Sequence, residues 1–330
     1  MKVEMIQLLR CPLCRSGLAV EVDEQEQNEI KEGRLVCAGC DKSYPVRNYI
    51  PRFVDDDNYT RGFGFQWNRH AQTLVDKFNG TQITADRFYQ CTKWAPEEIK
   101  GQRILEAGCG AGRFTEIMLN AGMEVISVDY SNAVDACLAN HGLAPNLHLI
   151  QGNIYQLPFE PGSFDKAFCF GVLQHTPDVK GSFMALADLV RPGGKIAVDV
   201  YPKTLKANLH YPRYLLRPLA KRLPAPLLYS IVVKAVDIFL PLSILLKKIP
   251  LIGRYLFPLL PVANYWGTLP LDRNMLREWS IIDTFDWLAC WYDQPQTAST
   301  LRSWLDEAGM TRAEVFRQGS FVGIGEKKTA

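Results

Sequence analysis

Residues 103–114 read Arg-Ile-Leu-Glu-Ala-Gly-Cys-Gly-Ala-Gly-Arg-Phe, and their pattern is the strongest indication of the fold class. Its first residues predict a short apolar strand, which runs directly into glycines at positions 108, 110 and 112. Apolar residues then recur at positions 114, 117, 118 and 121, a spacing that predicts a helix ended by Gly122. A strand, a glycine-rich turn and a helix in this order indicate one unit of an α/β domain.

The alternation of strands and helices continues downstream. Further apolar strands are predicted at residues 124–128, 147–151, 164–170 and 195–200. Such alternation requires a parallel sheet with right-handed crossovers. Two last strands, 311–318 and 321–327, lie so close together that they form an antiparallel hairpin. The sequence therefore predicts an α/β, Rossmann-like sheet of seven strands that ends in this hairpin.

The glycine spacing separates two classes of nucleotide ligand. A dinucleotide fingerprint requires a glycine at position 113, where this chain has Arg113. Glycines at alternate positions instead let the backbone approach a bulky ligand that is only weakly phosphate-like. Asp129 ends the second predicted strand, where a carboxylate can accept both ribose hydroxyls. The pattern disfavours NAD and leaves open a turn that serves only helix packing.

Two Cys-x-x-Cys pairs lie near the start of the chain, Cys11 with Cys14 and Cys37 with Cys40. Each pair supplies two thiolates from one turn, and four thiolates complete the tetrahedron that Zn²⁺ prefers. The acidic stretch 23–29 is predicted to be the tip of the hairpin between the pairs. A redox role is the alternative, although redox motifs seldom occur as two ribbon-spaced pairs. Because the cysteines fill all four positions, the predicted zinc is structural.

Composition and charge exclude several protein classes. The chain of 330 residues is 47% hydrophobic and 22% charged, which predicts a packed core. Its net charge of +2 gives no sign of nucleic-acid binding. Residues 1–14 have no apolar signal core, and the nine cysteines do not follow a secreted disulfide pattern. We therefore expect cytoplasmic localisation with reduced thiols.

A basic and apolar segment follows the fifth predicted strand. Residues 202–271 exceed what the minimal fold requires and are predicted to form a helical insert. Lysine and arginine outnumber acids ten to one between residues 203 and 254. Residues 227–246 are apolar enough to suggest a membrane span, but Lys234 and Asp237 interrupt them.

Two interpretations of this insert remain open. One is a lid that buries its apolar residues over the active site. The other is an interfacial platform, with Leu and Ile toward acyl chains and basic residues toward anionic headgroups. Those basic residues would include Lys221, Arg222, Lys247 and Lys248. Pro241 is expected to break the helix in either case.

Five segments resemble, in the same order, the motifs of class I methyltransferases that use S-adenosyl-L-methionine (SAM). They are residues 104–114, 128–131, 152–159, 164–178 and 189–194. The resemblance covers about residues 100–200 and implies a SAM site. The implied cofactor-binding residues are Glu106, Gly108, Gly110, Gly112, Asp129, Tyr130, Asn153, Ile154 and Gly171.

The same resemblance implies how these residues divide the cofactor between them. Glu106 and the backbone at Gly108 and Gly110 would hold its methionine part. Asp129 would hold the ribose, and Tyr130 would flank the adenine. Asn153 with Ile154 would face the polar edge of that ring. Asn stands where Asp is more usual, but its amide offers both a donor and an acceptor.

The N-terminal segment, residues 1–54, resembles the small zinc-ribbon subunit that supports tRNA and release-factor methyltransferases. The resemblance rests on Leu9–Cys14, Cys37–Cys40, Tyr44–Val46 and Ile50–Pro51. That subunit is a separate chain, whereas here the ribbon is fused, which implies a stabilising or activating role in cis. Residues 55–100 would then be a linker and cap segment, and residues 101–330 the methyltransferase domain with its insert.

His175 is the candidate catalytic base. It follows the fourth predicted strand, at the edge where ligands bind in open α/β sheets. A base helps methyl transfer only when the acceptor is a poor nucleophile such as a hydroxyl, so a role in the cofactor pocket is the alternative. Asp199 and Tyr201 are similarly placed. The aromatic segments 63–67 and 284–295 are expected to cap the cofactor and to cover the acceptor, respectively, or else simply to pack.

These features predict SAM-dependent methyl transfer to a small-molecule or lipid-linked acceptor, such as a saccharide or a quinone-like ring. The alternatives are an rRNA or tRNA methyltransferase and a SAM-binding, membrane-associated module without turnover. RNA binding requires basic residues interleaved with polar and stacking groups. Here they alternate with Leu, Ile, Val and Pro, so nucleic acid is disfavoured and peripheral membrane contact is the expected use.

Overall fold

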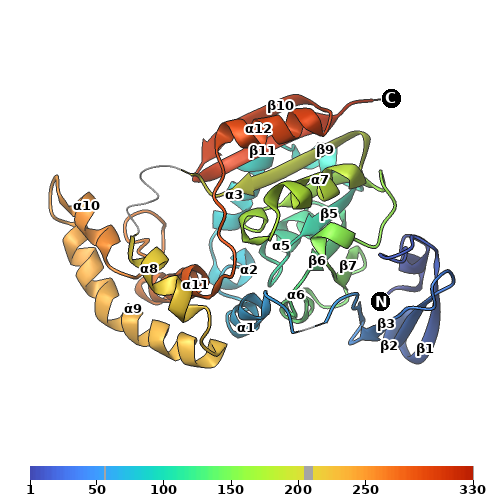
Figure 1. Ribbon diagram of the computed structural model, residues 1–330, viewed down its shortest axis with the longest axis horizontal. Helices are drawn as coiled ribbons and strands as arrows, with labels where there is room; N and C mark the ends of the chain where they lie inside the picture. Colours follow the sequence, from blue (N-terminus) through green and yellow to red (C-terminus); the bar gives the residue numbers. More distant parts are fainter. Residues whose placement is uncertain (56, 204–210, 330) are drawn as a thin grey trace.

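The computed structural model describes residues 1–55, 57–203 and 211–329. Figure 1 shows a large central sheet, with a small sheet at one end of the molecule and a helical lobe at the other. Residues 204–210, the first part of the predicted insert, lie outside the described residues.

The large sheet has seven strands in the order β10-β11-β9-β8-β5-β6-β7. Five of them are parallel, whereas β11 is antiparallel to both β9 and β10. The predicted seven-stranded sheet with an antiparallel C-terminal hairpin is therefore confirmed. The strands are β5 (Arg103–Ala107), β6 (Glu124–Asp129), β7 (Leu147–Gln151), β8 (Phe164–Cys169), β9 (Val190–Val200), β10 (Met310–Gln318) and β11 (Ser320–Lys327).

Helices cover both faces of this sheet, so its parallel strands are buried almost throughout. Core packing on one face includes Phe88 and Phe168, both fully buried. The helices of this part of the chain are α1 (Arg61–Arg69), α2 (Asp76–Asn79), α3 (Ile83–Thr92), α4 (Pro96–Ile99), α5 (Arg113–Asn120), α6 (Val134–His141), α7 (Val179–Leu189) and α12 (Ala298–Glu307).

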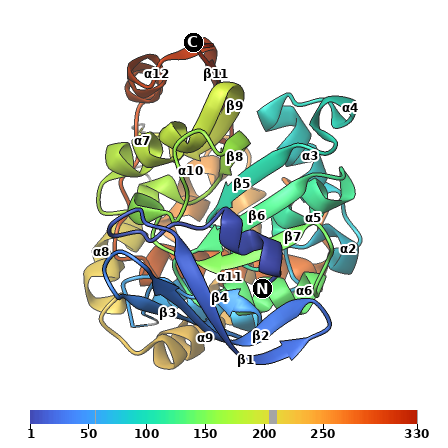
Figure 2. The same cartoon turned by 90° about the vertical axis from the view of Figure 1, so that its right-hand side faces the viewer.

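The small sheet is an antiparallel ribbon that lies beside β7 (Figures 1 and 2). Its strands are β1 (Leu18–Glu26), β2 (Glu29–Cys37), β3 (Ser43–Arg47) and β4 (Ile50–Pro51). The turn between β1 and β2 falls inside the acidic stretch 23–29, which confirms the predicted hairpin tip. Arg52 forms a β-bridge with Gln151 at the end of β7, so the ribbon extends the edge of the large sheet.

The helical lobe consists of α8 (Tyr211–Ala220), α9 (Ala225–Lys247), α10 (Gly253–Leu256) and α11 (Arg273–Ala289). The expectation that Pro241 breaks the helix was wrong, because α9 continues through it. The backbone carbonyl that Pro241 leaves without a partner is that of Asp237, and both residues lie on the exposed side of α9, where water can reach that carbonyl. Among the described residues, α9 is the one helix long and apolar enough to cross a membrane.

Candidate active site

One cavity of about 670 Å³ lies at the carboxyl ends of the parallel strands. Its sheet side includes the turns after β5, β6, β7 and β8, and its other side includes α1 and the helical lobe. The sheet side includes Gly108, Gly110, Asp129, Tyr130, Ile154 and Gly171, and the helical side includes Phe63, Trp67, Arg213, Trp279, Asp283, Asp286 and Trp287. This volume is typical of a site for a cofactor and a small acceptor together.

Glycine is required at both positions of the turn that face the cavity. Gly108 and Gly110 have φ angles of +79° and +53°. A Cβ atom on Gly108 would lie 2.2 Å from a methyl carbon of Val172. Trp67 from α1 lies directly over Gly110, at 3.4 Å from the position of such a Cβ atom. The turn therefore approaches the cavity with bare backbone.

Asp129 is fixed by backbone and hydroxyl donors at the end of β6. Its Oδ2 accepts the Gly110 N–H at 2.9 Å, and its Oδ1 accepts the N–H and Oγ–H of Ser131 at 2.8 and 2.7 Å. Burial raises the pKa of this carboxyl, while the three hydrogen bonds oppose the shift. A carboxylate has about four acceptor positions, so capacity remains for a hydroxyl that enters the cavity.

Three of the predicted cofactor-binding residues do not line the cavity. Glu106 is buried behind it, where its Oε2 accepts the hydroxyls of Thr115 at 2.5 Å and Ser127 at 2.6 Å, and burial raises its pKa to about 7. Gly112 allows α5 to pack on α6, because a Cβ atom there would lie 2.5 Å from His141 Nε2. Asn153 Oδ1 accepts the backbone N–H of the residue two positions on, at 3.1 Å, and so caps a short 3₁₀ turn.

His175 lines the cavity on a 3₁₀ turn after β8. Its Nδ1 lies 2.9 Å from the backbone oxygen of Tyr292. Because a carbonyl can only accept, Nδ1 carries the hydrogen of the neutral ring and Nε2 carries the lone pair. Nε2 has no hydrogen-bond partner among the described residues. The ring packs between Phe63 and Tyr201, so its free nitrogen is held on a fixed ring and can accept a proton.

Two arginines that the sequence did not single out, Arg87 and Arg113, also line the cavity. Of the two residues expected beside the candidate base, Tyr201 lines the cavity and Asp199 does not. Arg87 pairs with buried Asp199 at 2.5 Å, and Asp199 also accepts the Gly171 N–H at 2.6 Å. Burial, together with the charge of Arg87, lowers the pKa of Arg113 to about 10, so Arg113 is still a cation at neutral pH. The sequence signal for Arg113 was present, since it directly follows the glycine turn.

Asp283 and Asp286 lie one turn apart on α11 and line the cavity from the helical lobe. Burial and the neighbouring Asp286 raise the pKa of Asp283 to about 7. Burial likewise raises the pKa of Asp286, whose Oδ1 has no partner among the described residues. The segment 284–295 was expected here, and Asp286, Trp287 and Pro295 are the members of it that line the cavity.

The four predicted cysteine ligands gather in the ribbon. Their Sγ atoms all lie within 4.8 Å of one another. Two of the separations are 3.7 Å, between Cys11 and Cys40, and 3.3 Å, between Cys14 and Cys37. Zinc–sulfur bonds of about 2.3 Å in a tetrahedron place sulfur atoms roughly 3.8 Å apart, so the cluster is compatible with zinc.

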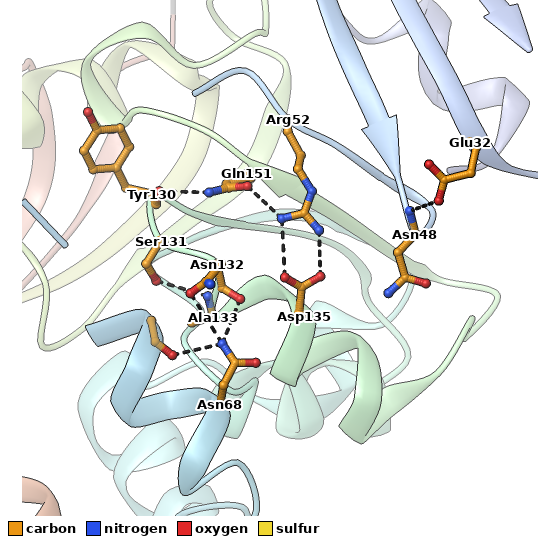
Figure 3. A network of polar contacts seen from close by, with 11 residues as sticks. Glu32, Asn48, Arg52, Asn68, Tyr130, Ser131, Asn132, Ala133, Asp135 and Gln151 are labelled. Carbon is orange, nitrogen blue, oxygen red and sulfur yellow. Dashed lines mark hydrogen bonds and ion pairs between the residues drawn. The ribbon is translucent and has the colours of Figure 1, made fainter. Parts of the chain in front are cut away.

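Arg52 joins the ribbon to the strands that hold the site (Figure 3). Its guanidinium makes an ion pair of 2.6 Å with Asp135 on α6 and donates to Gln151 Oε1 at 2.8 Å. Gln151 Nε2 in turn lies 3.4 Å from the backbone oxygen of Tyr130, which lines the cavity. A polar chain therefore runs from the ribbon to the residue beside Asp129.

Curated proteins resemble part of the chain. An uncharacterized protein of Synechococcus sp. is 28% identical over 233 residues, covering 67% of this chain and 50% of that protein. The ubiquinone biosynthesis O-methyltransferase of Cupriavidus pinatubonensis is 34% identical over 115 residues, covering 34% of this chain and 46% of the relative. The chain thus spans about half the length of the curated relatives it matches.

Solved structures with a similar arrangement have low sequence identity. The complex of the Haloferax volcanii Trm112 methyltransferase activator matches at 13% identity and a TM-score of 0.46, covering 83% of this chain and 99% of that one. Magnesium protoporphyrin IX methyltransferase from Synechocystis, with bound S-adenosyl-L-homocysteine (SAH), matches at 16% identity and a TM-score of 0.42, covering 82% and 97%.

Family models match at the two places that the fold sets apart. A model described as a methyltransferase domain matches residues 105–198, which hold the glycine turn, Asp129 and His175. A model described as Trm112p-like protein matches residues 2–48, which hold the four cysteines. The chain therefore contains a methyltransferase domain at residues 105–198 and a Trm112p-like domain at residues 2–48.

Proposed function

We propose that this chain transfers a methyl group from SAM to a hydroxyl of a small-molecule acceptor. The observation that supports this best is the pairing of two unlike walls across one cavity. The glycine turn and Asp129 belong to the first wall, on the sheet side, and the carboxylates of α11 belong to the second, on the helical side. His175, on the turn after β8, lines the same cavity. The first wall suits a nucleoside, and the second suits a hydroxyl-bearing acceptor.

The residues of the first wall have the chemistry that SAM requires. The Asp129 carboxylate would accept the ribose hydroxyls, and the bare backbone at Gly108 and Gly110 would lie against the methionine part. Arg113 would pair with the carboxylate of that methionine part. SAM supplies an electrophilic methyl group on a sulfonium. We propose, in addition, that the four ribbon cysteines hold a structural Zn²⁺.

His175 would act as the general base. As the acceptor oxygen forms its bond to the methyl carbon, the bond from that carbon to sulfur breaks and sulfur becomes neutral. The hydroxyl proton passes to His175 Nε2, which carries the lone pair in this structure. Alignment of the three reacting atoms accounts for the remaining acceleration.

His175→Ala should therefore lower methyl transfer by about 10²–10⁴-fold and leave SAH binding intact. The measurement follows the tritiated methyl group of SAM into acceptors of a whole-cell extract, with SAH affinity from calorimetry as the control. Undiminished transfer in this variant would show that the acceptor needs no base, or that another group provides it.

The second wall favours an acceptor with several hydroxyl groups over a quinone-like ring. Gln66, Trp279 and Asp286 all line the cavity, and each has a buried polar atom without a partner among the described residues. An unpaired buried polar group costs about 1–3 kcal/mol, so an acceptor that satisfies several of them is favoured. A saccharide offers many hydroxyls next to aromatic side chains, whereas a quinone-like ring offers one or two.

We propose a saccharide carried on a lipid as this acceptor. In the extract assay, the tritium label should partition into organic solvent and move into water after mild acid hydrolysis releases the saccharide. Asp286→Asn should lower transfer at least about tenfold, with little change in SAH affinity. Label that stays in the organic phase after hydrolysis would instead identify a quinone-like acceptor.

A further inference from the structure

Exposed apolar side chains concentrate in one part of the molecule. Most of the large apolar residues that are exposed among the described residues fall between residues 211 and 266, in the helical lobe. They are Leu215, Leu216, Leu219, Leu227, Ile231, Ile238, Leu242, Leu245, Ile249, Leu251, Ile252, Tyr255, Leu259 and Trp266. A concentration of exposed apolar side chains in one lobe on this scale marks a binding face.

Helix α9 has two apolar faces. The inner face carries Leu228, Val232, Val236 and Leu240, which are buried in the same cluster as residues of α11. The outer face carries exposed Leu or Ile at positions 227, 231, 238, 242 and 245, a spacing that also follows one side of a helix. A lid needs only the inner face. The outer face belongs to the lobe at the end of the molecule opposite the ribbon (Figure 1).

The segment after α9 makes an apolar tip between basic residues. Leu251 is 86% exposed, and Ile249 and Ile252 beside it are also exposed. Lys248 and Arg254 lie on either side of this tip, and both are exposed. Apolar side chains at a tip flanked by cations match the boundary between acyl chains and anionic headgroups.

The one acidic residue between residues 211 and 254, Asp237, does not neutralise the basic residues of this segment. Asp237 is engaged by Arg277 of α11 at 2.6 Å. Two of the basic residues expected at the headgroups, Lys221 and Lys247, are only partly exposed, and Lys247 donates to the Trp266 carbonyl at 2.6 Å. Lys248 lies over the Trp266 ring and Arg254 over the Tyr255 ring, but both side chains remain exposed. The exposed cations are Arg222, Lys234, Lys248 and Arg254.

We propose that this outer face docks on an anionic membrane surface, with α9 lying along the surface and the tip at residues 249–252 entering the headgroup region. Because α11 covers the inner face of α9, the helix packs against the protein along its length instead of crossing the bilayer. The same lobe provides the cavity residues Arg213 and Asp286, so docking turns the acceptor side of the cavity toward lipid. Only this last consequence depends on the proposed methyl transfer.

Vesicle co-sedimentation tests the docking without SAM or any acceptor. We expect the full chain to bind vesicles in which roughly a third of the lipid is phosphatidylglycerol, to bind phosphatidylcholine vesicles far less, and to dissociate as salt rises. Lys248→Glu combined with Arg254→Glu should weaken binding at least about tenfold. Leu251→Glu, and Ile238→Glu combined with Leu245→Glu, should abolish it.

Matched variants elsewhere separate docking from general effects of charge. Leu143→Glu alters a leucine that is 43% exposed outside the lobe, and Lys42→Glu with Arg47→Glu reverses two exposed charges of the ribbon. Both should bind vesicles as the parent chain does, and all variants should retain SAH affinity and cooperative unfolding. Absence of sedimentation at low salt, or equal binding to neutral vesicles, overturns the proposal. A dimer that Ile238→Glu dissociates, without vesicle binding, would assign the face to a second copy.

Discussion

Asp129→Ala will show no measurable SAH binding by titration calorimetry, although the variant still unfolds cooperatively. The change removes the carboxylate proposed to accept the ribose hydroxyls. It also leaves the Gly110 N–H, now 2.9 Å from Asp129 Oδ2, without its acceptor. Each such loss costs about 1–3 kcal/mol in a buried site, so together they weaken binding by at least about thirtyfold.

Asp188→Ala is the control for this experiment, because Asp188 is an exposed carboxylate of α7 that does not line the cavity. It should bind SAH as the parent chain does. Ser131→Ala removes one of the donors that hold Asp129, the hydroxyl, but keeps the carboxylate, and it should give a smaller loss. Equal affinities for Asp129→Ala and the parent chain would refute the cofactor assignment.

Removal of the proposed zinc should unfold the ribbon and should also weaken SAH binding. Structural zinc contributes about 10–16 kcal/mol of apparent binding energy in zinc-finger peptides, which exceeds the stability of a small ribbon. An unfolded ribbon no longer holds Arg52 against Asp135 and Gln151. The strand ends around Tyr130 then lose a support, so the effect reaches the cofactor side of the cavity.

Elemental analysis should find one zinc ion per chain, and Cys40→Ser should lose it together with stability. Cys290→Ala removes a buried cysteine outside the ribbon and should retain the metal. Arg52→Ala should retain zinc as well but should still weaken SAH binding, which separates the metal from the contact that transmits its effect. A metal-free chain of full stability, purified without chelator, would contradict the zinc assignment.

The sequence predicted those parts of the fold that are determined by residues close to one another in the chain. The glycine turn, the sheet and the cysteine pairs each involve residues close in sequence whose spacing has one structural meaning. Side-chain direction was harder to predict: Glu106 and Asn153 occupy motif positions, yet hydrogen bonds to nearby groups turn both away from the cavity wall. A motif fixes a backbone position, and neighbours decide where its side chain points.

The acceptor wall was the least predictable part. Asp283 and Asp286 are more than a hundred residues from the glycine turn in sequence, and they reach the cavity because α9 and α11 pack together as one layer. The packing depends on which of the two apolar faces of α9 contacts α11. Both faces are rich in apolar residues, so the amino-acid composition does not predict which one is buried. The prediction at Pro241 failed for a related reason, since a proline is tolerated where the freed carbonyl meets water.

Because the ribbon and the methyltransferase domain belong to one chain, the specific activity should respond to dilution differently from that of a two-chain enzyme. A separate activator subunit must bind its enzyme, so activity falls once both are diluted below their dissociation constant. Here nine residues separate β4 from α1, and the contacts of Arg52 form within one chain. A short tether gives an effective concentration in the millimolar range. Specific activity should therefore stay constant on dilution, and no excess of a partner chain should raise it.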